Sequence, residues 1–422
     1  MKKKLVSLFS GCGGMDLGFE GNFKVLQKSI NKYSNSAWIK EEWKHFCLLK
    51  GTSFETVFAN DISPYAYSSW APYFESRGKK EKIFHTESII DLVNKHKSGG
   101  NIFPTNVDIV TGGFPCQDFS VAGKRKGFNS HKSHTGKGLS KYDEPSTENR
   151  GMLYYWMREV IEITKPKVFI AENVKGLISL GKVKEMIEND FRSIDKKGYI
   201  VVPSQVLNAA NYGVPQNRER IIFIGLNKKY LKKEAIAAMS YSVIPEKYNP
   251  YPPITHYKDK SESLLLNFQY QNKKLCPLVK CKDAFIGLKE PDDTKDLSQM
   301  EYSKAKLFKN SQGNVEINLN TVSPTIRAEH HGNIEYRRLS KANGGRNIHE
   351  LKKGLKERRL TIRECARLQT FPDDYNFVRV DKKNRKKSLS ASGAYKVIGN
   401  AVPPLLAYNM AKRLEAIWKY LF

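Results

Sequence analysis

The first half of the chain alternates short apolar runs with amphipathic stretches. "KLVSLFS" at 4–10, "FETVFAND" at 54–61 and "VDIVTGGFP" at 107–115 have the length and composition of buried strands. "YYWMREVIEITKP" at 154–166 and "VKEMIENDFRSIDKKG" at 183–198 have helical spacing. Strands that alternate with helices of this length predict βαβ units, and therefore an α/β fold with a doubly wound, mostly parallel sheet.

The pattern changes after about residue 228. "YNPYPPITHY" and the stretch that follows it show little helical periodicity, and their prolines and short alternating runs predict a smaller, irregular, β-containing domain. Helical character returns at "LTIRECARLQTF" and in the amphipathic end "PPLLAYNMAKRLEAIWKYLF". The chain therefore combines a regular α/β part with an irregular one.

The net charge of the chain indicates which class of partner it binds. Lysine and arginine total 71 against 43 acidic residues, a net charge of +28. Such an excess favours nucleic acid as a partner; a solvated basic surface and a polybasic membrane patch are the alternatives, and the even spread of the basic residues disfavours the patch. No apolar run approaches about 18 residues, so no membrane-spanning helix is expected.

The six cysteines form no CxxC pair and have no histidine at metal-ligand spacing. We therefore expect no metal site and no disulfide framework, which suits a reducing cytoplasm. Cys116 stands apart, because "GGFPCQDFS" places it in a loop directly after a buried strand. That setting suits a nucleophilic thiol, and the alternative is a small buried hydrophobe.

A glycine turn follows the first predicted strand, in "LVSLFSGCGGMDLGFEG". Glycines there let the backbone approach a ligand whose polar part meets the amino end of a helix, although many such turns only pack a helix on a strand. The next strand ends in Asp61, which suits a hydrogen bond to ribose hydroxyls. Together the two features suggest a nucleoside cofactor without saying which one.

Six motifs that occur in one order along the chain together indicate a specific protein family. In chain order they are "FSGCGG", "GGFPCQDFS", "ENV", "QNRER", "LTIRECARLQTFPDDY" and "YKVIGNAVPP". Over about residues 4–226 and 320–420 the chain resembles the bacterial DNA (cytosine-5) methyltransferase family, the methylases of type II restriction-modification systems. The resemblance implies S-adenosyl-L-methionine as methyl donor and double-stranded DNA with a short specific site as substrate. It also implies a monomer in the bacterial cytoplasm that protects host DNA from a cognate restriction endonuclease acting on the same site.

The resemblance assigns four catalytic residues. Cys116 would add to C6 of cytosine, so that C5 becomes able to attack the methyl donor. Glu172 would exchange a proton at N3 of the ring. Arg218 and Arg220 alternate along a predicted strand and would bind the base carbonyl and neighbouring phosphates, with a surface salt bridge as the alternative for an Arg-Glu-Arg triplet.

The cofactor residues implied by the resemblance come from several loops. Asp61 would bind the ribose, and Ile62 would pack on the adenine. Where the family often has an acidic residue facing the adenine amino group, this chain has Ser88, which can still accept a hydrogen bond. The remaining residues expected to line this site are Phe9, Gly11, Gly13, Ile89, Pro115, Leu153, Asn400 and Val402.

The loop after Cys116 is expected to close on DNA. The DNA-binding residues expected by resemblance are Gln117, Ser120, Lys124, Arg125 and Arg218. An insertion at 129–148 lengthens this loop, and its two histidines, His131 and His134, are interpreted as solvent or phosphate contacts. A second insertion, near 21–52, contains "SAWIKEEWKHF", which we expect to be helical.

The resemblance also divides the chain. Residues 1–245, completed by 393–422, would form the catalytic and cofactor-binding domain, 246–320 the target-recognition domain, and 321–392 the hinge and the rest of the small domain. An RNA cytosine-5 methyltransferase is the nearest rival function, although RNA-acting relatives usually lack a large recognition domain. A DNA-binding protein without activity is the other alternative, and the presence of Cys116, Glu172 and the glycine turn opposes it.

Overall fold

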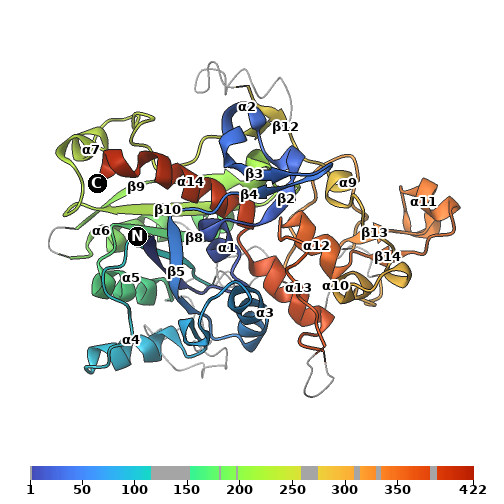
Figure 1. Ribbon diagram of the computed structural model, residues 1–422, viewed down its shortest axis with the longest axis horizontal. Helices are drawn as coiled ribbons and strands as arrows, with labels where there is room; N and C mark the ends of the chain where they lie inside the picture. The colour runs from blue at the N-terminus through green and yellow to red at the C-terminus, as the bar shows by residue number, and fades with distance from the viewer. Residues whose placement is uncertain are drawn as a thin grey trace.

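A seven-stranded sheet forms the centre of the larger part of the protein in the computed structural model (Figure 1). The structure describes residues 2–115, 153–179, 182–195, 198–257, 274–307, 314–328, 334–380 and 387–422. In spatial order the strands are β6 (Phe84–His85), β5 (Phe54–Asn60), β1 (Lys3–Leu8), β7 (Ile109–Gly113), β8 (Val168–Val174), β10 (Glu219–Asn227) and β9 (Tyr199–Asn208).

Strand direction confirms the expected doubly wound, mostly parallel sheet. β1 is parallel to both β5 and β7, and β7 is parallel to β8. β10 is antiparallel to β8 and β9. The carboxyl ends of β1, β5, β7 and β8 therefore meet at one edge of the sheet, where open α/β sheets bind their ligands.

Helices cover both faces of the sheet (Figure 1). Successive residues of one strand supply opposite cores: Ile170 belongs to one hydrophobic cluster, and Phe169 and Ala171 belong to the other. One face carries α1 (Gly14–Glu20), α3 (Pro64–Glu75), α7 (Lys233–Ala238) and α14 (Pro404–Leu421). The other face carries α4 (Ile89–Lys97), α5 (Leu153–Thr164) and α6 (Val183–Arg192).

The insertion after α1 folds as a small antiparallel sheet, so the expectation of a helix at "SAWIKEEWKHF" was wrong. Its elements are β2 (Lys24–Leu26), α2 (Lys32–Asn35), β3 (Ile39–Glu42) and β4 (Phe46–Leu49), with strand order β2-β4-β3. Cys47 and Leu49 are buried while Phe46 and Leu48 are only half-buried, which is the period of two of a strand. Pairing with β2 and β3 decides the conformation here, not local helical propensity.

Residues 256–400 build a smaller, irregular part with short elements, of which α9, α10, α11, β13 and β14 lie on the right side of Figure 1. They are β11 (His256–Tyr257), β12 (Cys276–Pro277), α9 (Cys281–Ala284), α10 (Leu297–Met300), β13 (Tyr336–Arg338), α11 (Ile348–Lys352), β14 (Arg358–Arg359), α12 (Ile362–Leu368) and α13 (Ala391–Asn400).

Ion pairs hold much of this part together. Arg338 and Arg358 both bond the Glu290 carboxylate, and Arg358 also bonds Glu364 at 2.8 and 2.9 Å. Although burial raises the pKa of Glu290, the hydrogen bonds from the two arginines lower it to about 2. Buried arginines thus occupy positions that a regular domain would fill with apolar side chains.

Candidate active site

The glycine turn after β1 has the conformation that a close ligand approach requires. Gly11 and Gly13 have φ of +54° and +73°, and Phe9 shares this left-handed region at +52°. A Cβ on Gly13 would lie 2.6 Å from ring atoms of both Trp70 and Phe74, whereas one on Gly11 would meet nothing within 4 Å. Gly13 is therefore required by packing, and Gly11 leaves open space above the turn.

Asp61 lies directly beside this turn. Its carboxylate accepts hydrogen bonds from the backbone N–H of Gly11 at 2.9 Å and of Ser63 at 2.8 Å. Burial raises the pKa of Asp61, and these two N–H groups and the charge of Lys396 oppose that rise. The structure thus brings together the glycine turn and the acidic residue that were expected to share one ligand.

Three other residues expected at the cofactor site follow β5 and β6 in the sequence. Ile62 follows Asp61 and is 46% exposed, an apolar side chain open to a ligand. Ser88 is the N-cap of α4 and its hydroxyl accepts from the Ile90 N–H at 3.3 Å, while Ile89 begins that helix and is buried. The Ser88 hydroxyl is therefore already engaged in capping a helix.

The remaining residues expected at the cofactor site come from segments next to β7, α5 and α13. Asn400 is the exposed last residue of α13, and Val402 follows in the turn before α14. A Cβ on Gly14 would lie only 2.2 Å from the Val402 carbonyl oxygen, so α1 and this turn are in direct backbone contact. Leu153 is buried at the start of α5, and Pro115, half-buried, is the last residue described before the cysteine loop.

Glu172 and Arg220 form a buried ion pair near the end of β8. The Glu172 Oε1 lies 2.7 Å from the Arg220 Nε, and both side chains are at most 10% exposed. Gly113, paired with Glu172 in the sheet, has no side chain, and a Cβ there would lie 2.8 Å from the Glu172 Oε2. Burial raises the pKa of Glu172, while Arg220 and then Arg218 oppose that rise. The carboxyl group therefore holds a proton more readily than an ordinary glutamate.

Asn173 connects this strand to the segment that leads to Cys116. Its Nδ2 donates to the Phe114 carbonyl at 3.1 Å, and its Oδ1 accepts from the Val174 N–H at 2.8 Å. The amide thus fixes the backbone two residues before the cysteine.

Arg218 lies in a different environment from Arg220. Its guanidinium is fully buried and donates to the Ile326 carbonyl at 3.0 Å and to the Gly399 carbonyl at 2.7 Å. In this arrangement Arg218 links three segments that are distant in the sequence. The two arginines were expected to point to one side together; Arg220 bonds Glu172, and Arg218 bonds the two carbonyls and lowers the pKa of Glu172 through its charge.

Several expected residues lie outside the part of the chain that the structure describes. They are Cys116, Gln117, Ser120, Lys124, Arg125, His131 and His134. Their assignments stay predictions from the sequence.

Two buried polar residues that support the site were not found by the sequence reasoning. Asp16 is completely buried behind the glycine turn, where Ser7 Oγ and Trp70 Nε1 donate to it and burial raises its pKa to about 6. Gln216 accepts from the Ile326 N–H at 3.1 Å. A carboxylate within the apolar stretch "GMDLGF" was the available signal for Asp16.

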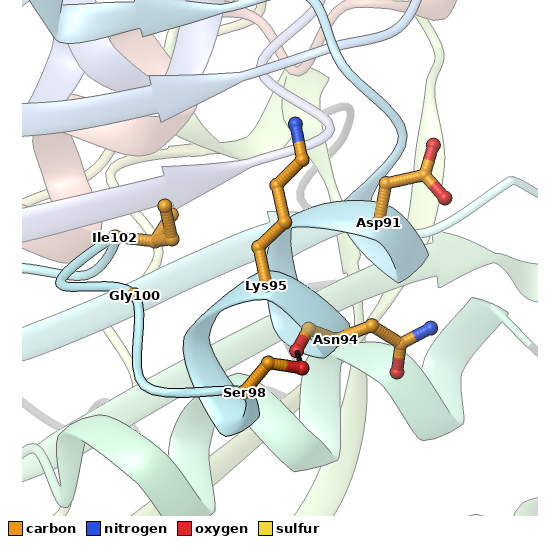
Figure 2. Close-up of a pocket in the computed structure, with 6 residues that line it drawn as sticks. All are labelled: Asp91, Asn94, Lys95, Ser98, Gly100 and Ile102. Carbon is orange, nitrogen blue, oxygen red and sulfur yellow. Dashed lines mark hydrogen bonds between the residues drawn. The ribbon is translucent and has the colours of Figure 1, made fainter.

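A surface pocket of about 640 Å³ at the carboxyl end of α4 shares no residue with this site. Figure 2 shows that its polar side chains do not converge: Lys95 points away from Asn94, and its ammonium pairs with Glu87. Within the described ranges no three His, Cys, Asp or Glu residues are grouped to hold a metal ion. In the same ranges no helix is both long and apolar enough to cross a membrane.

Comparisons with known proteins agree with the motifs. Residues 3–416 match the family described as C-5 cytosine-specific DNA methylase. The chain is 30% identical to the type II methyltransferase M.BspRI of Lysinibacillus sphaericus, over 98% of this chain and 81% of that protein. It is 29% identical to the type II methyltransferase M.BsuRI of Bacillus subtilis, over 97% of this chain and 78% of that protein.

Two solved structures show the same fold. The S. pombe Dnmt2 methyltransferase matches 98% of this chain and 99% of its own, with a TM-score of 0.53 and 15% identity. The Entamoeba histolytica methyltransferase EhMeth matches 99% of this chain and 98% of its own, with a TM-score of 0.55 and 14% identity. At these identities the likeness concerns the fold alone.

Proposed function

This chain belongs to the C-5 cytosine-specific DNA methylase family, and from that premise we propose how its residues carry out the reaction. It is a DNA cytosine-5 methyltransferase of the type found in restriction-modification systems. The proposed reaction transfers a methyl group from S-adenosyl-L-methionine to C5 of a cytosine flipped out of duplex DNA. The observation that carries the proposal is the buried Glu172–Arg220 pair, which shares one edge of the sheet with the glycine turn and Asp61.

The residues around the glycine turn fit a nucleoside cofactor. The open space above Gly11, the Asp61 carboxylate and the exposed Ile62 offer a backbone approach, a ribose acceptor and an apolar surface for a base. S-adenosyl-L-methionine, when bound there, supplies an electrophilic methyl group. Asn400 and Val402 would close the site from the other end of the chain.

Cys116 is the proposed nucleophile. Its thiolate forms a bond to C6 of the flipped cytosine, and the electron pair of the C5–C6 double bond becomes available at C5. C5 then bonds the methyl carbon, whose bond to sulfur breaks. Loss of the C5 proton to a base restores the double bond and expels the Cys116 thiolate, so that the enzyme is regenerated.

Glu172 is the proposed proton partner of the ring. Because burial raises its pKa, this carboxyl group holds a proton more readily than an exposed glutamate and would share that proton with N3 while negative charge develops there. Arg220 would fix the orientation of that carboxyl group through the 2.7 Å contact and face the base carbonyl. For Arg218 the proposed contact to DNA requires it to leave the two backbone carbonyls it now bonds.

We propose the same division of the chain that the motifs suggest. Residues 1–245 with 393–422 would bind the cofactor and carry the chemistry, 246–320 would read the DNA site, and 321–392 would complete the small domain. A single chain holds every proposed catalytic residue, so a monomer suffices. The biological role would be protection of host DNA from a restriction endonuclease acting on the same site.

A trap for the covalent step tests this mechanism. Duplex DNA with 5-fluorocytosine at the target position has no C5 proton to lose, so the wild-type protein should remain covalently attached to it and shift on a denaturing gel. Cys116→Ser should give no shifted band and no methyl transfer, while its affinity for S-adenosyl-L-methionine, measured by calorimetry, stays within about twofold of wild type. Methyl transfer by that variant at a rate near wild type would exclude the cysteine as nucleophile.

A further inference from the structure

Three segments meet at a buried polar point near residue 256. The His256 ring is fully buried, its Nε2 lies 2.9 Å from the Lys28 carbonyl oxygen, and its Nδ1 lies 2.8 Å from the Thr255 hydroxyl. A carbonyl only accepts, so Nε2 carries the hydrogen and Nδ1 accepts from Thr255. Burial lowers the pKa of His256 to about 4, which keeps the ring neutral at physiological pH.

Asn31 makes the second set of contacts between the insertion and the small part. Its Nδ2 donates to the Thr255 carbonyl at 3.1 Å and to the Lys274 carbonyl at 2.7 Å, while its Oδ1 caps α2 by accepting from the Tyr33 N–H at 3.0 Å. Since Asn31 is 1% exposed, these hydrogen bonds have no competition from bulk water. One amide therefore fixes residues just before β11 and just before β12.

Lys28 adds a charged contact at the edge of the same region. Its Nζ lies 2.6 Å from Asp283 Oδ1 in the first turn of α9, and the Asp283 side chain is 8% exposed. The insertion itself is anchored on the catalytic side by Trp38 and Phe23, whose rings pack edge-to-face on Tyr408 of α14. The insertion therefore lies between α14 and the small part, in contact with both.

The turn that precedes Arg218 and β10 lies against Ser29 and His256. Gly213 has φ of +83°, and a Cβ there would lie 2.1 Å from the Ser29 carbonyl oxygen and 3.0 Å from His256 Cε1. No larger residue fits between the insertion and His256. Five residues after this turn begins the stretch that contains Arg218 and Arg220.

We propose that the insertion sets the position of the recognition segment, residues 246–320, relative to Arg218 and to β10, which carries Arg220. Lys28, Asn31 and His256 act as positioning residues for target recognition. We call these three residues and Gly213 the insertion junction. The inference rests on the proposed role of residues 246–320 in reading DNA. The insertion junction includes none of the proposed cofactor residues, so its loss should change how DNA is recognised and leave cofactor binding unchanged.

A charge exchange across the junction tests the proposal. Lys28→Glu should raise the KM for target DNA and reduce the preference for the target over a one-mismatch site by about tenfold, because the buried Asp283 carboxylate then faces a like charge. Asp283→Lys should reduce this preference at least as much, because it also removes the carboxylate that accepts from the Lys280 N–H in the cap of α9. kcat at saturating DNA and the Kd for S-adenosyl-L-methionine should stay within about twofold. The double variant should recover the part of the preference that depends on the Lys28–Asp283 pair, since the pair is restored with opposite polarity while the α9 cap stays lost.

Asn31→Asp provides a second test, which removes hydrogen bonds to uncharged backbone groups. The carboxylate can still cap α2 but cannot donate to the Thr255 and Lys274 carbonyls. It should reduce target preference at least as much and should speed amide hydrogen exchange at Cys276, whose N–H bonds the Thr255 carbonyl at 3.0 Å. The matched control exchanges Lys32 and Glu42, a pair 2.8 Å apart within the insertion whose side chains are 45% and 44% exposed. That exchange should leave every parameter unchanged.

Two outcomes would overturn the inference. In the first, Lys28→Glu and Asn31→Asp keep the wild-type preference for the target over a one-mismatch site although amide hydrogen exchange at Cys276 is faster. In the second, kcat, DNA binding and cofactor binding are all lost to the same extent, which would mean a role in stability alone. Failure of the underlying proposal gives a different result. In that case, replacing residues 246–320 by those of a relative with another target would leave the methylated sequence unchanged.

Discussion

Two opposing effects act on Glu172. Burial disfavours its charged form, and the Arg220 guanidinium 2.7 Å away favours it. Burial is the larger effect, so the pKa of Glu172 is raised. The raised pKa favours the protonated form relative to an ordinary glutamate, which is the direction that the proposed contact to cytosine N3 requires.

Glu172→Gln should reduce kcat by about a hundredfold or more, since an amide cannot transfer a proton and general acid–base groups typically contribute 10²–10⁴. In the wild-type protein the rate of the methylation step should fall as the pH rises through the raised pKa of Glu172, because the proton is lost. The variant should lack this fall. Single-turnover methylation measured from pH 5 to 9 checks both expectations.

Glu219→Gln is the matched control for that substitution. Glu219 neighbours Arg220 in the chain but is 41% exposed and pairs with Lys175 at 2.9 Å. Its loss should leave the rate and the pH profile unchanged. A pH profile of Glu172→Gln that follows the wild type would show that another group holds the proton.

Single residues differ in how well the sequence predicted their surroundings. Asp61 and the glycines were predicted together, because their contact follows from the ends of two neighbouring parallel strands. Arg218 was expected beside Arg220, because alternation along a strand places both on one face. Its burial against Ile326 and Gly399 depends on segments over a hundred residues away, which a local pattern does not contain.

Among the elements, α1 depends on its contact with the turn before α14. Gly14→Ala should destabilise the protein by about 1–3 kcal/mol, because its Cβ would lie 2.2 Å from the Val402 carbonyl oxygen and backbone atoms must move. The same movement separates the glycine turn from Val402, so the Kd for S-adenosyl-L-methionine should rise at least severalfold. Urea denaturation and calorimetry measure the two effects.

Gly51→Ala serves as the comparison, since its Cβ would have its nearest contact at 3.7 Å from the Glu20 carbonyl oxygen, an ordinary van der Waals distance. It should change neither stability nor cofactor affinity appreciably. Equal effects of the two alanines would mean that the α1 contact does not limit the site.

The insertion shows where prediction of elements failed. The apolar residues Trp38, Ile39, Trp43 and Phe46 would share one side of a helix, and nothing in the stretch excludes that conformation. The structure instead pairs Ile39 with Leu49 and Val25 with Cys47. Strand pairing is a non-local interaction, and a short segment carries little information about a partner twenty residues away.

For the molecule as a whole, the net charge of +28 predicts strongly salt-dependent DNA binding. Affinity for a duplex without the target site should fall by about a thousandfold between 50 and 200 mM salt if roughly six phosphates are contacted. Fluorescence anisotropy of labelled duplex at several salt concentrations gives the slope. Cys116→Ser should show the same slope, because the thiol takes no part in phosphate contacts, and a slope near zero would contradict a basic DNA-binding surface.

The larger part of the fold was predictable from the sequence, and the smaller part was predictable only in outline. Apolar strands and amphipathic helices identify the doubly wound sheet because each element buries a continuous face. The small part has few such faces. Its interior includes the Glu290 carboxylate with Arg338 and Arg358, and ion pairs between distant residues leave no periodic pattern.

The meeting of Gly14 with Val402, and of Tyr375 with the Cys12 carbonyl 363 residues earlier in the sequence, has a consequence for biosynthesis. A ribosome makes the glycine turn long before it makes the turn that precedes α14. The nascent chain thus carries half of the proposed cofactor site throughout synthesis, and translation must pass Val402 before the site closes. The proposed methyl transfer would then begin only after Val402 has been synthesised, and the nascent chain before that point would be unable to modify DNA.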